Sequence, residues 1–121
     1  MQKEIIKLMQ LVVKQAGSLI KEYHFEKGPV YIGRQIDSQI PLPDVSVSRQ
    51  HAVVFGPDED KWFIEDLESA NKTFLNDKAI HKSQINDGDV VRIGNFSINM
   101  FLAETPAAPQ KQTAYASDAP T

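Results

Sequence analysis

Residues 86–102 read NDGDVVRIGNFSINMFL, and this stretch has the residue pattern of a complete β-hairpin. Its second half alternates large apolar residues with polar ones: Phe96, Ser97, Ile98, Asn99 and Met100. Alternation with a period of two is typical of a strand that buries one face. The apolar run at 90–93 comes before it across a Gly-Asn turn, and an Asn-Asp-Gly-Asp turn precedes that run. The stretch therefore predicts a hairpin of two paired strands, the last in the chain.

The same pattern continues towards the N-terminus. Short apolar runs separated by turn residues predict strands at about 8–14, 19–26, 30–32, 40–42, 52–55, 62–64, 74–75 and 79–80. Residues 1–16 are ambiguous because their apolar positions also fit helical spacing, and the turn at Gly17-Ser18 favours a hairpin with a first strand over 8–14. The first few residues are expected to be frayed. Many short strands and no convincing helix predict an all-β sandwich.

Composition narrows the classes of function. The chain has 121 residues, which suits one domain, and its net charge of −3 disfavours a nucleic-acid partner. It contains no cysteine, which excludes disulfides, thiolate nucleophiles and cysteine zinc sites. No apolar run approaches the roughly 18 residues of a membrane span, and the N-terminus lacks a signal-peptide pattern. These features predict a cytoplasmic protein with no membrane partner.

The C-terminal segment differs from the rest. Residues 103–121 are rich in Ala, Pro, Thr, Gln and Ser. Such a segment buries too little apolar surface to offset the entropy lost on ordering. We therefore expect a folded domain over 1–102 and a disordered tail or linker over 103–121.

Polar clusters follow the apolar runs where the chain is expected to turn: Gly33-Arg34, Ser48-Arg49-Gln50-His51, and residues 66–76. They supply cations and hydrogen-bond donors. Arg34 offers a planar fork of donors that matches an oxyanion, and Asn71 offers an amide that can donate to and accept from a peptide backbone. The clusters predict a phosphate-reading site on loops at one end of the sandwich.

A catalytic interpretation has less support. Ser48 lacks the Gly-x-Ser-x-Gly surroundings of a hydrolase nucleophile. None of His24, His51 and His81 has metal-ligand partners at useful spacing. We therefore expect no catalytic residue, no metal, no cofactor and no enzyme activity, and we assign His51 a structural role in holding the loops.

Taken together, these motifs resemble the signature of forkhead-associated (FHA) domains, over about residues 9–102. The segments that carry the resemblance are Gly33-Arg34, Ser48-Arg49-x-His51, Ser69-x-Asn71-x-Thr73-x-x-Asn76, residues 29–34 and residues 87–94. The resemblance implies an eleven-stranded antiparallel β-sandwich of the FHA/SMAD-like type. It also implies a signalling module that binds phosphothreonine peptides through the loops at one end.

The resemblance assigns site residues by position. The residues expected to bind phosphate are Arg34, Ser48 and Arg49. The residues expected to contact the peptide are Asn71, Ala70 and Lys72. The residues expected to support the loops are Gly33, His51, Thr73 and Asn76. Lys72 departs from the family, which usually has glycine there, and Ala70 stands where a hydroxyl residue is common.

The implied partner is a phosphothreonine protein made by an upstream Ser/Thr protein kinase. The alternative is a scaffold module of the same fold that associates without phosphate, and the changes at Ala70 and Lys72 keep it open. A further hypothesis is that the tail, phosphorylated at Thr105, Thr113 or Thr121, occupies the site of its own or another copy of the chain; the alternative is that this segment is a plain linker.

Overall fold

The structure of the protein is a computed structural model that describes residues 5–106, with side chains from Leu8 to Ala103. The predicted frayed residues at the N-terminus, and the predicted tail beyond Pro106, lie outside this range. The described chain contains eleven strands and no helix, as predicted. The strands are β1 Ile5–Gln15, β2 Ser18–Phe25, β3 Val30–Gly33, β4 Ile40–Pro41, β5 Ala52–Asp58, β6 Lys61–Asp66, β7 Thr73–Leu75, β8 Lys78–Ile80, β9 Lys82–Ile85, β10 Val90–Ile93 and β11 Phe96–Pro106.

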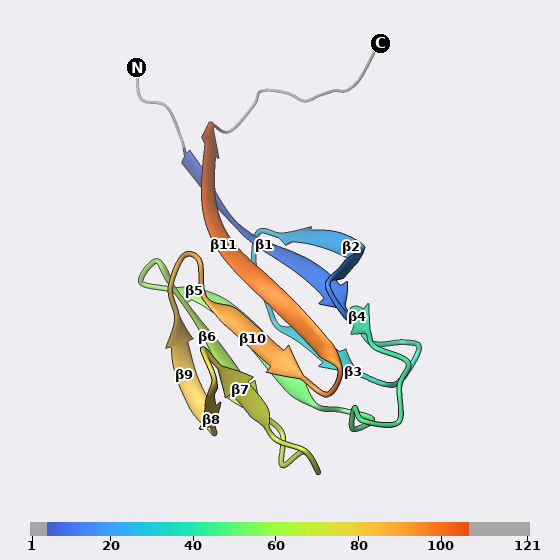
Figure 1. The fold of residues 1–121 in the computed structure, drawn as a ribbon. Coiled ribbons are helices and arrows are strands. Elements are labelled where there is room, and N and C mark those ends of the chain that lie inside the picture. The colour runs from blue at the N-terminus through green and yellow to red at the C-terminus, as the bar shows by residue number, and fades with distance from the viewer. Residues whose placement is uncertain (1–4, 107–121) are drawn as a thin grey trace, which may run out of the picture.

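The strands form two sheets that pack face to face (Figure 1). One sheet has six strands in the order β2-β1-β11-β10-β7-β8, and the other has five in the order β4-β3-β5-β6-β9. The predicted antiparallel sandwich is confirmed, with one exception: β3 and β4 run parallel. Strand β4 pairs with β3 alone, because Pro41 and Pro43 restrict it to the edge of its sheet.

The core lies between the sheets and follows the alternation seen in the sequence. Phe96, Ile98 and Met100 on β11 are at most 4% exposed, whereas Ser97 and Asn99 between them are half-buried on the other face. Trp62 is the largest fully buried side chain of the described residues. Its indole N–H has no hydrogen-bond partner among them, so this side chain contributes through packing.

The structure differs from the prediction at three strands. Strand β9 was not predicted, because Ile85 is its only buried residue and its pairing is set by β6. Strand β5 continues past its predicted end at Phe55 and through Gly56-Pro57, where its pairing register with β6 shifts. Strand β11 continues past Leu102 to Pro106, because β1 pairs with it along its whole length up to Ile5.

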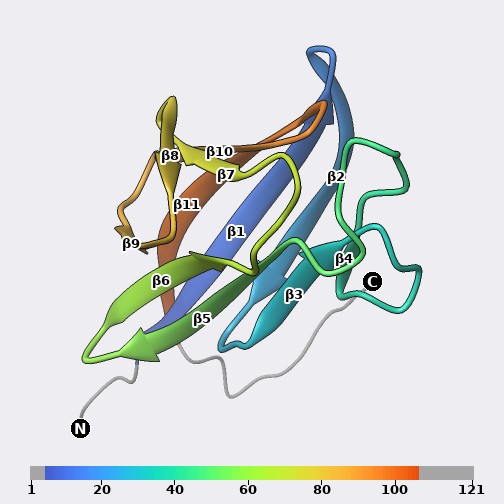
Figure 2. The ribbon, with the colours of Figure 1, turned by 90° about the horizontal axis from the view of Figure 1, so that it is seen from below.

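Four loops gather at one end of the sandwich, at the lower right of Figure 1, and Figure 2 shows the same grouping from below. They are the loops β3–β4, β4–β5 and β6–β7 and the turn β10–β11. Ile5 and Pro106 lie at the opposite end of the β1–β11 pair, because the register joins Gln15 to Phe96 at the loop end. The three polar clusters of the sequence therefore meet at one end of the fold.

Candidate functional site

Gly33 ends β3 and allows the β4–β5 loop to approach it. A Cβ atom at this position would lie 2.0 Å from the carbonyl oxygen of Arg49, which no side chain can tolerate. The approach is held by backbone bonds, in which Arg34 N–H donates to Ser48 O at 3.0 Å and Gln35 N–H donates to Arg49 O at 3.4 Å. Glycine at 33 thus fixes the separation of Arg34 from Ser48.

The Arg34 and Arg49 side chains are both exposed at this junction. Within residues 8–103, whose side chains the structure describes, neither guanidinium has an ion pair or a hydrogen bond to another side chain. Each cation therefore keeps its donors available to a ligand.

Ser48 connects the β4–β5 loop to the β6–β7 loop. Its hydroxyl oxygen accepts a hydrogen bond from Ala70 N–H at 3.0 Å. This bond uses a lone pair of the hydroxyl and leaves its O–H free to donate, because a serine hydroxyl both donates and accepts. Ser48 is half-buried, so its hydroxyl is held in place at the surface.

His51 is fully buried at the start of β5 and contacts both loops through its ring. Its Nδ1 accepts from Ser48 N–H at 3.0 Å, and its Nε2 lies 2.9 Å from Lys72 O. These partners require the tautomer that carries its proton on Nε2 and donates it to the Lys72 carbonyl. The ring thus links the Ser48 segment directly to the end of the β6–β7 loop.

Asp66 is the hydrogen-bond centre of the β6–β7 loop. Its carboxylate accepts from the Ser69 N–H and hydroxyl and, at 2.7 Å, from the buried Thr73 hydroxyl. Burial raises the pKa of the Asp66 carboxyl, but the hydrogen bonds from Ser69 and Thr73, together with the nearby His51, outweigh it and leave the pKa below its usual value. The carboxylate therefore stays charged and keeps the loop closed at neutral pH.

Lys72 adopts the left-handed conformation, with φ of 68°. This is the conformation that glycine takes without cost, so the lysine here carries backbone strain of about 1 kcal/mol. Glu68, in the same loop, is also left-handed with φ of 55°. Ala70 and Lys72 are both exposed beside Asn71.

Asn71 is exposed, and its amide is anchored to the β4–β5 loop. Its Nδ2 donates to Ser46 O at 3.0 Å. Within residues 5–106 its Oδ1 has no hydrogen-bond partner, so the amide presents an unused acceptor at the surface.

Three further residues at this end were given no role from the sequence: Asp44, Ser46 and Asn95. Ser46 donates both its N–H and its hydroxyl to Asp44 Oδ2, and Asn95 N–H donates to Ser46 Oγ at 3.2 Å. The Asp-x-Ser spacing is typical of a side chain that closes a turn on the backbone two residues later, so this signal was present in the sequence.

Two aliphatic residues on the same loops also had no assigned role. Ile36 in the β3–β4 loop is 92% exposed, and Val45 in the β4–β5 loop is 89% exposed. These values mark them as surface residues on the segments that carry Arg34 and Ser48.

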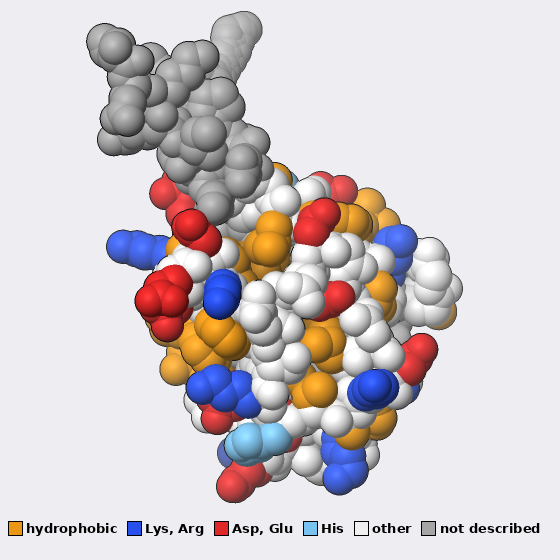
Figure 3. All heavy atoms as spheres, turned by 90° about the vertical axis from the view of Figure 1, so that its left-hand side faces the viewer, with side chains coloured by type: hydrophobic (Ala, Val, Ile, Leu, Met, Phe, Trp, Pro, Cys, Tyr) orange, Lys and Arg blue, Asp and Glu red, His pale blue; other side chains and the backbone are white. Residues whose placement is uncertain are grey.

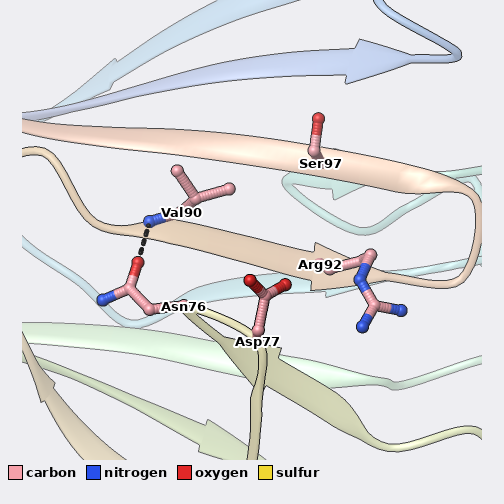
Figure 4. A pocket seen from close by; sticks show the side chains of 5 residues that line it. All are labelled: Asn76, Asp77, Val90, Arg92 and Ser97. Carbon is pink, nitrogen blue, oxygen red and sulfur yellow. Dashed lines mark hydrogen bonds between the residues drawn. The ribbon is translucent and has the colours of Figure 1, made fainter.

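Thr73 and Asn76 occupy opposite ends of β7. Thr73 belongs to the Asp66 cluster, whereas Asn76 Oδ1 accepts from Val90 N–H at 3.0 Å and its Nδ2 donates to Asp89 at 2.9 Å. Asn76 therefore holds the β9–β10 loop, beside a shallow hollow that it lines with Asp77, Val90, Arg92 and Ser97 (Figure 4). It supports a loop, but a different one from those that gather around Ser48.

The charge on the surface is mixed. On the face shown in Figure 3, Lys and Arg side chains alternate with Asp and Glu, and no continuous basic stripe crosses it. Among the side chains of residues 8–103 there is no group of three or more that could hold a metal ion. The same residues contain no helix that is long and apolar enough to cross a membrane.

Comparison with known proteins identifies the class. The family model for the FHA domain matches residues 30–94, more than half of the chain, and the chain therefore belongs to the FHA domain family. FHA domains are phosphothreonine-dependent interaction modules in signalling. One similar solved structure is described as "Structural and functional analysis of phosphothreonine-dependent FHA domain interactions"; it is 32% identical, covers 78% of this chain and 95% of that one, and superposes with a TM-score of 0.70.

A second solved structure, the FhaA FHA domain complexed with the intracellular domain of Rv3910, is 33% identical. The match covers 76% of this chain and 98% of that one, with a TM-score of 0.68.

Curated relatives agree with this assignment. The glycogen accumulation regulator GarA of Mycobacterium tuberculosis is 33% identical over 73% of this chain and 54% of its own length. The oxoglutarate dehydrogenase inhibitor of Corynebacterium jeikeium is 34% identical over 73% of this chain and 60% of its own length. Both have names of regulatory proteins. FhaA of Mycobacterium tuberculosis is 37% identical over 64% of this chain, but the match spans only 15% of FhaA. The match thus covers a part of each of these relatives.

Proposed function

We propose that the chain binds phosphothreonine proteins at the end where Arg34, Ser48 and Asn71 lie. The observation that carries this proposal is the convergence of the three loops, in which Ser48 bonds to Arg34 N–H through its carbonyl and to Ala70 N–H through its hydroxyl. The Arg34 guanidinium and the Ser48 O–H bind the phosphate oxygens, and Arg49 adds a second cation. Asn71 binds the peptide backbone beside the phosphothreonine.

The expected energetics follow from the charge of the ligand. A phosphothreonine carries about −1.5 to −2 charges near neutral pH and has three strong acceptor oxygens. A hydrogen bond with a charged partner contributes about 1.5 to 3 kcal/mol, before the costs of ordering are subtracted. Three or four such bonds are compatible with micromolar affinity, about −8 kcal/mol. The unphosphorylated peptide lacks these bonds, so the module discriminates between the two states.

The test removes the guanidinium. Arg34→Ala should weaken binding of a phosphothreonine peptide, selected from a library on the unaltered chain, by about 10- to 150-fold, which corresponds to 1.5 to 3 kcal/mol. Calorimetry measures the affinity and thermal unfolding measures stability, which should change little because the side chain is exposed.

Arg92→Ala is the matched control. It removes the same charge from the outer face of the six-stranded sheet, where the guanidinium lies 4.3 Å from the centre of the Phe74 ring. Equal affinity of the unaltered chain and Arg34→Ala would contradict the proposed phosphate site.

The second candidate is a scaffold of the same fold that binds its partner without phosphate. The observations that favour it are the strained Lys72 and the absence of a hydroxyl at Ala70. Comparing the phosphorylated and unphosphorylated forms of one peptide separates the two functions, since a scaffold would bind both equally.

In this proposal the upstream partner is a Ser/Thr protein kinase, and the chain acts in the cytoplasm. We propose binding and no catalysis, because the three side chains proposed to contact the ligand, Arg34, Ser48 and Asn71, supply the donors and acceptors that suit an anion and a peptide backbone.

For the tail hypothesis, chain length separates the three threonines. Thr105 belongs to β11, where its backbone pairs with Ile6. Phe96, at the loop end of β11, lies about 33 Å from Pro106 along the strand, at about 3.3 Å per residue. Thr113 follows Pro106 by seven residues, about 25 Å when fully extended, and Thr121 by fifteen, about 54 Å. Only Thr121 has the reach to occupy the site of its own chain; phosphorylated Thr113 would bind a second copy. We expect binding of a tail phosphorylated at Thr113 to depend on protein concentration, and binding of a tail phosphorylated at Thr121 to be independent of it.

A further inference from the structure

The anchored amide of Asn71 has consequences for which atom contacts the ligand. Its Nδ2 is held by Ser46 O at 3.0 Å, whereas its Oδ1 has no partner within the described residues. An amide held by its nitrogen directs its carbonyl oxygen elsewhere, and a carbonyl oxygen accepts hydrogen bonds. The direction in which Asn71 presents its free Oδ1 therefore depends on the position of the Ser46 carbonyl.

The Ser46 carbonyl is fixed by a side chain two residues earlier. Asp44 Oδ2 accepts the Ser46 N–H at 2.9 Å and the Ser46 hydroxyl at 2.5 Å. These bonds close a tight turn over 44–46, and the next residue, Val47, anchors the turn in the core with 1% exposure. The carboxylate thus determines the direction of the peptide group that holds Asn71.

The turn is also attached to the other sheet. Asn95 donates its backbone N–H to Ser46 Oγ and, at 3.3 Å, its Nδ2 to the same Asp44 oxygen. Gly94 makes this approach possible, because a Cβ atom there would lie 2.3 Å from Ser46 Oγ and its φ is 57°. The Asp44–Ser46–Asn95 bracket, as we name these three residues, therefore connects the β10–β11 turn to the β4–β5 loop.

We propose that Asp44 is a positioning residue for ligand binding: through Ser46 it orients the Asn71 amide so that Oδ1 accepts a backbone N–H from the bound peptide. This inference rests on the proposed function. It assigns a role in binding an anionic ligand to an acidic residue, which Coulomb's law alone would oppose. The carboxylate is suited to the role because the Ser46 hydroxyl and N–H hold the pKa of Asp44 below its usual value, so it remains an acceptor at neutral pH.

Charge repulsion and positioning predict opposite changes in affinity when Asp44 is removed, so the direction of the change tests the inference. Removing an acid near a phosphate should tighten binding by reducing repulsion, whereas removing a positioning residue should weaken it. We expect Asp44→Ala to bind the selected phosphothreonine peptide about 3- to 10-fold more weakly, the equivalent of one hydrogen bond. Asp37→Ala is the matched control, because Asp37 is an exposed acid in the neighbouring β3–β4 loop with no hydrogen bond within the described residues. It should bind as tightly as the unaltered chain, or more tightly.

A double-mutant cycle shows whether Asp44 acts through Asn71. In the Asn71→Ala background, Asp44→Ala should cause no further loss of affinity, because the side chain that it positions is absent. Ser46→Ala is a milder second variant, which keeps the carbonyl and loses only the hydroxyl. Ser46→Ala should also weaken binding, and it tests the inference if Asp44→Ala fails to fold.

The outcomes separate the inference from the function on which it rests. An unaltered chain that does not bind the phosphorylated library overturns the proposed function. Binding by the unaltered chain, with Asp44→Ala as tight as Asp37→Ala, overturns the positioning role alone. A loss from Asp44→Ala that is undiminished in the Asn71→Ala background also overturns it, since Asp44 would then act on another part of the site.

Discussion

Gly33 provides the most direct test of how the loops are held together. In Gly33→Ala the new Cβ atom would lie 2.0 Å from Arg49 O and 2.9 Å from the carbon of the same carbonyl. Ordinary contact begins at 3.4 Å, so the loop must move by about 1.4 Å. Both clashing atoms belong to the backbone, and no side-chain rotation relieves the contact. The substitution therefore moves Ser48 away from Arg34.

The magnitude follows from the contacts that this movement breaks. A shift of about 1.4 Å takes the bond from Arg34 N–H to Ser48 O well beyond hydrogen-bond distance, since it begins at 3.0 Å. Overpacking costs about 1 to 3 kcal/mol and each lost hydrogen bond about 0.5 to 1.5 kcal/mol, so we expect a destabilisation of about 2 to 4 kcal/mol. Separating the two phosphate ligands should weaken phosphothreonine-peptide binding by at least about tenfold.

Urea denaturation and calorimetry measure the two effects on one preparation. The matched control is Gly88→Ala, in the β9–β10 loop at the other end of β10. Its Cβ meets nothing within 4 Å, and its φ of 89° makes the substitution strained. It should lose stability without losing affinity. If Gly33→Ala kept both its stability and its affinity within a factor of two, the close approach would not be what positions Ser48.

Three further predictions concern the loops and the ligand. Lys72→Gly should raise the free energy of unfolding by about 0.5 to 1 kcal/mol, because glycine relieves the left-handed strain. Lys72→Ala keeps the strain and removes the same charge, so it should not raise the free energy of unfolding. Equal stability of the two variants in thermal unfolding would contradict the strain at this position. Asp66 has a lowered pKa in the folded state, so its contribution to stability is present above its unfolded pKa of about 3.9 and is lost as pH falls through the lower folded pKa. The stability gap between the unaltered chain and Asp66→Asn should therefore narrow below about pH 4, and a gap that stays constant in denaturation from pH 6 to 3 would exclude the linkage. Phosphopeptide affinity should fall as pH drops below about 6, where the phosphate dianion gains a proton, and an affinity by calorimetry that is constant from pH 7.5 to 5 would show that the dianion is not what binds.

The sequence was most informative where the pattern of residues is local. The alternation over 96–100 predicted which side chains are buried, and the structure places them in the core. Between the predicted strands at 74–75 and 79–80, Asn76 and Asp77 are residue types that tolerate positive φ, and they have φ of 49° and 72°. His51 was assigned a structural role from the sequence, and its buried ring is hydrogen-bonded to two loops.

Prediction failed where a strand depends on its neighbour. Strand β9 has one buried residue, so its sequence has no alternation, and it is a strand because Gln84 and its neighbours pair with β6. The end of β11 was placed at Leu102 because the composition changes there, but pairing with β1 extends the strand to Pro106. In both cases the hydrogen-bond partner supplied what the local sequence lacked.

The sequence by itself determined the class of fold, the family and the set of side chains available to bind an anion, because periodicity and motif spacing are properties of the chain. Only the tertiary structure decided which of these groups meet and which of their atoms remain free. Arg34, Ser48 and Asn71 are far apart in sequence, and they are joined by contacts that no spacing reveals: a glycine that admits a carbonyl, a buried imidazole and a bracket centred on Asp44. The physical reason is that each hydrogen bond here connects different loops, so its geometry exists only once both sheets are assembled.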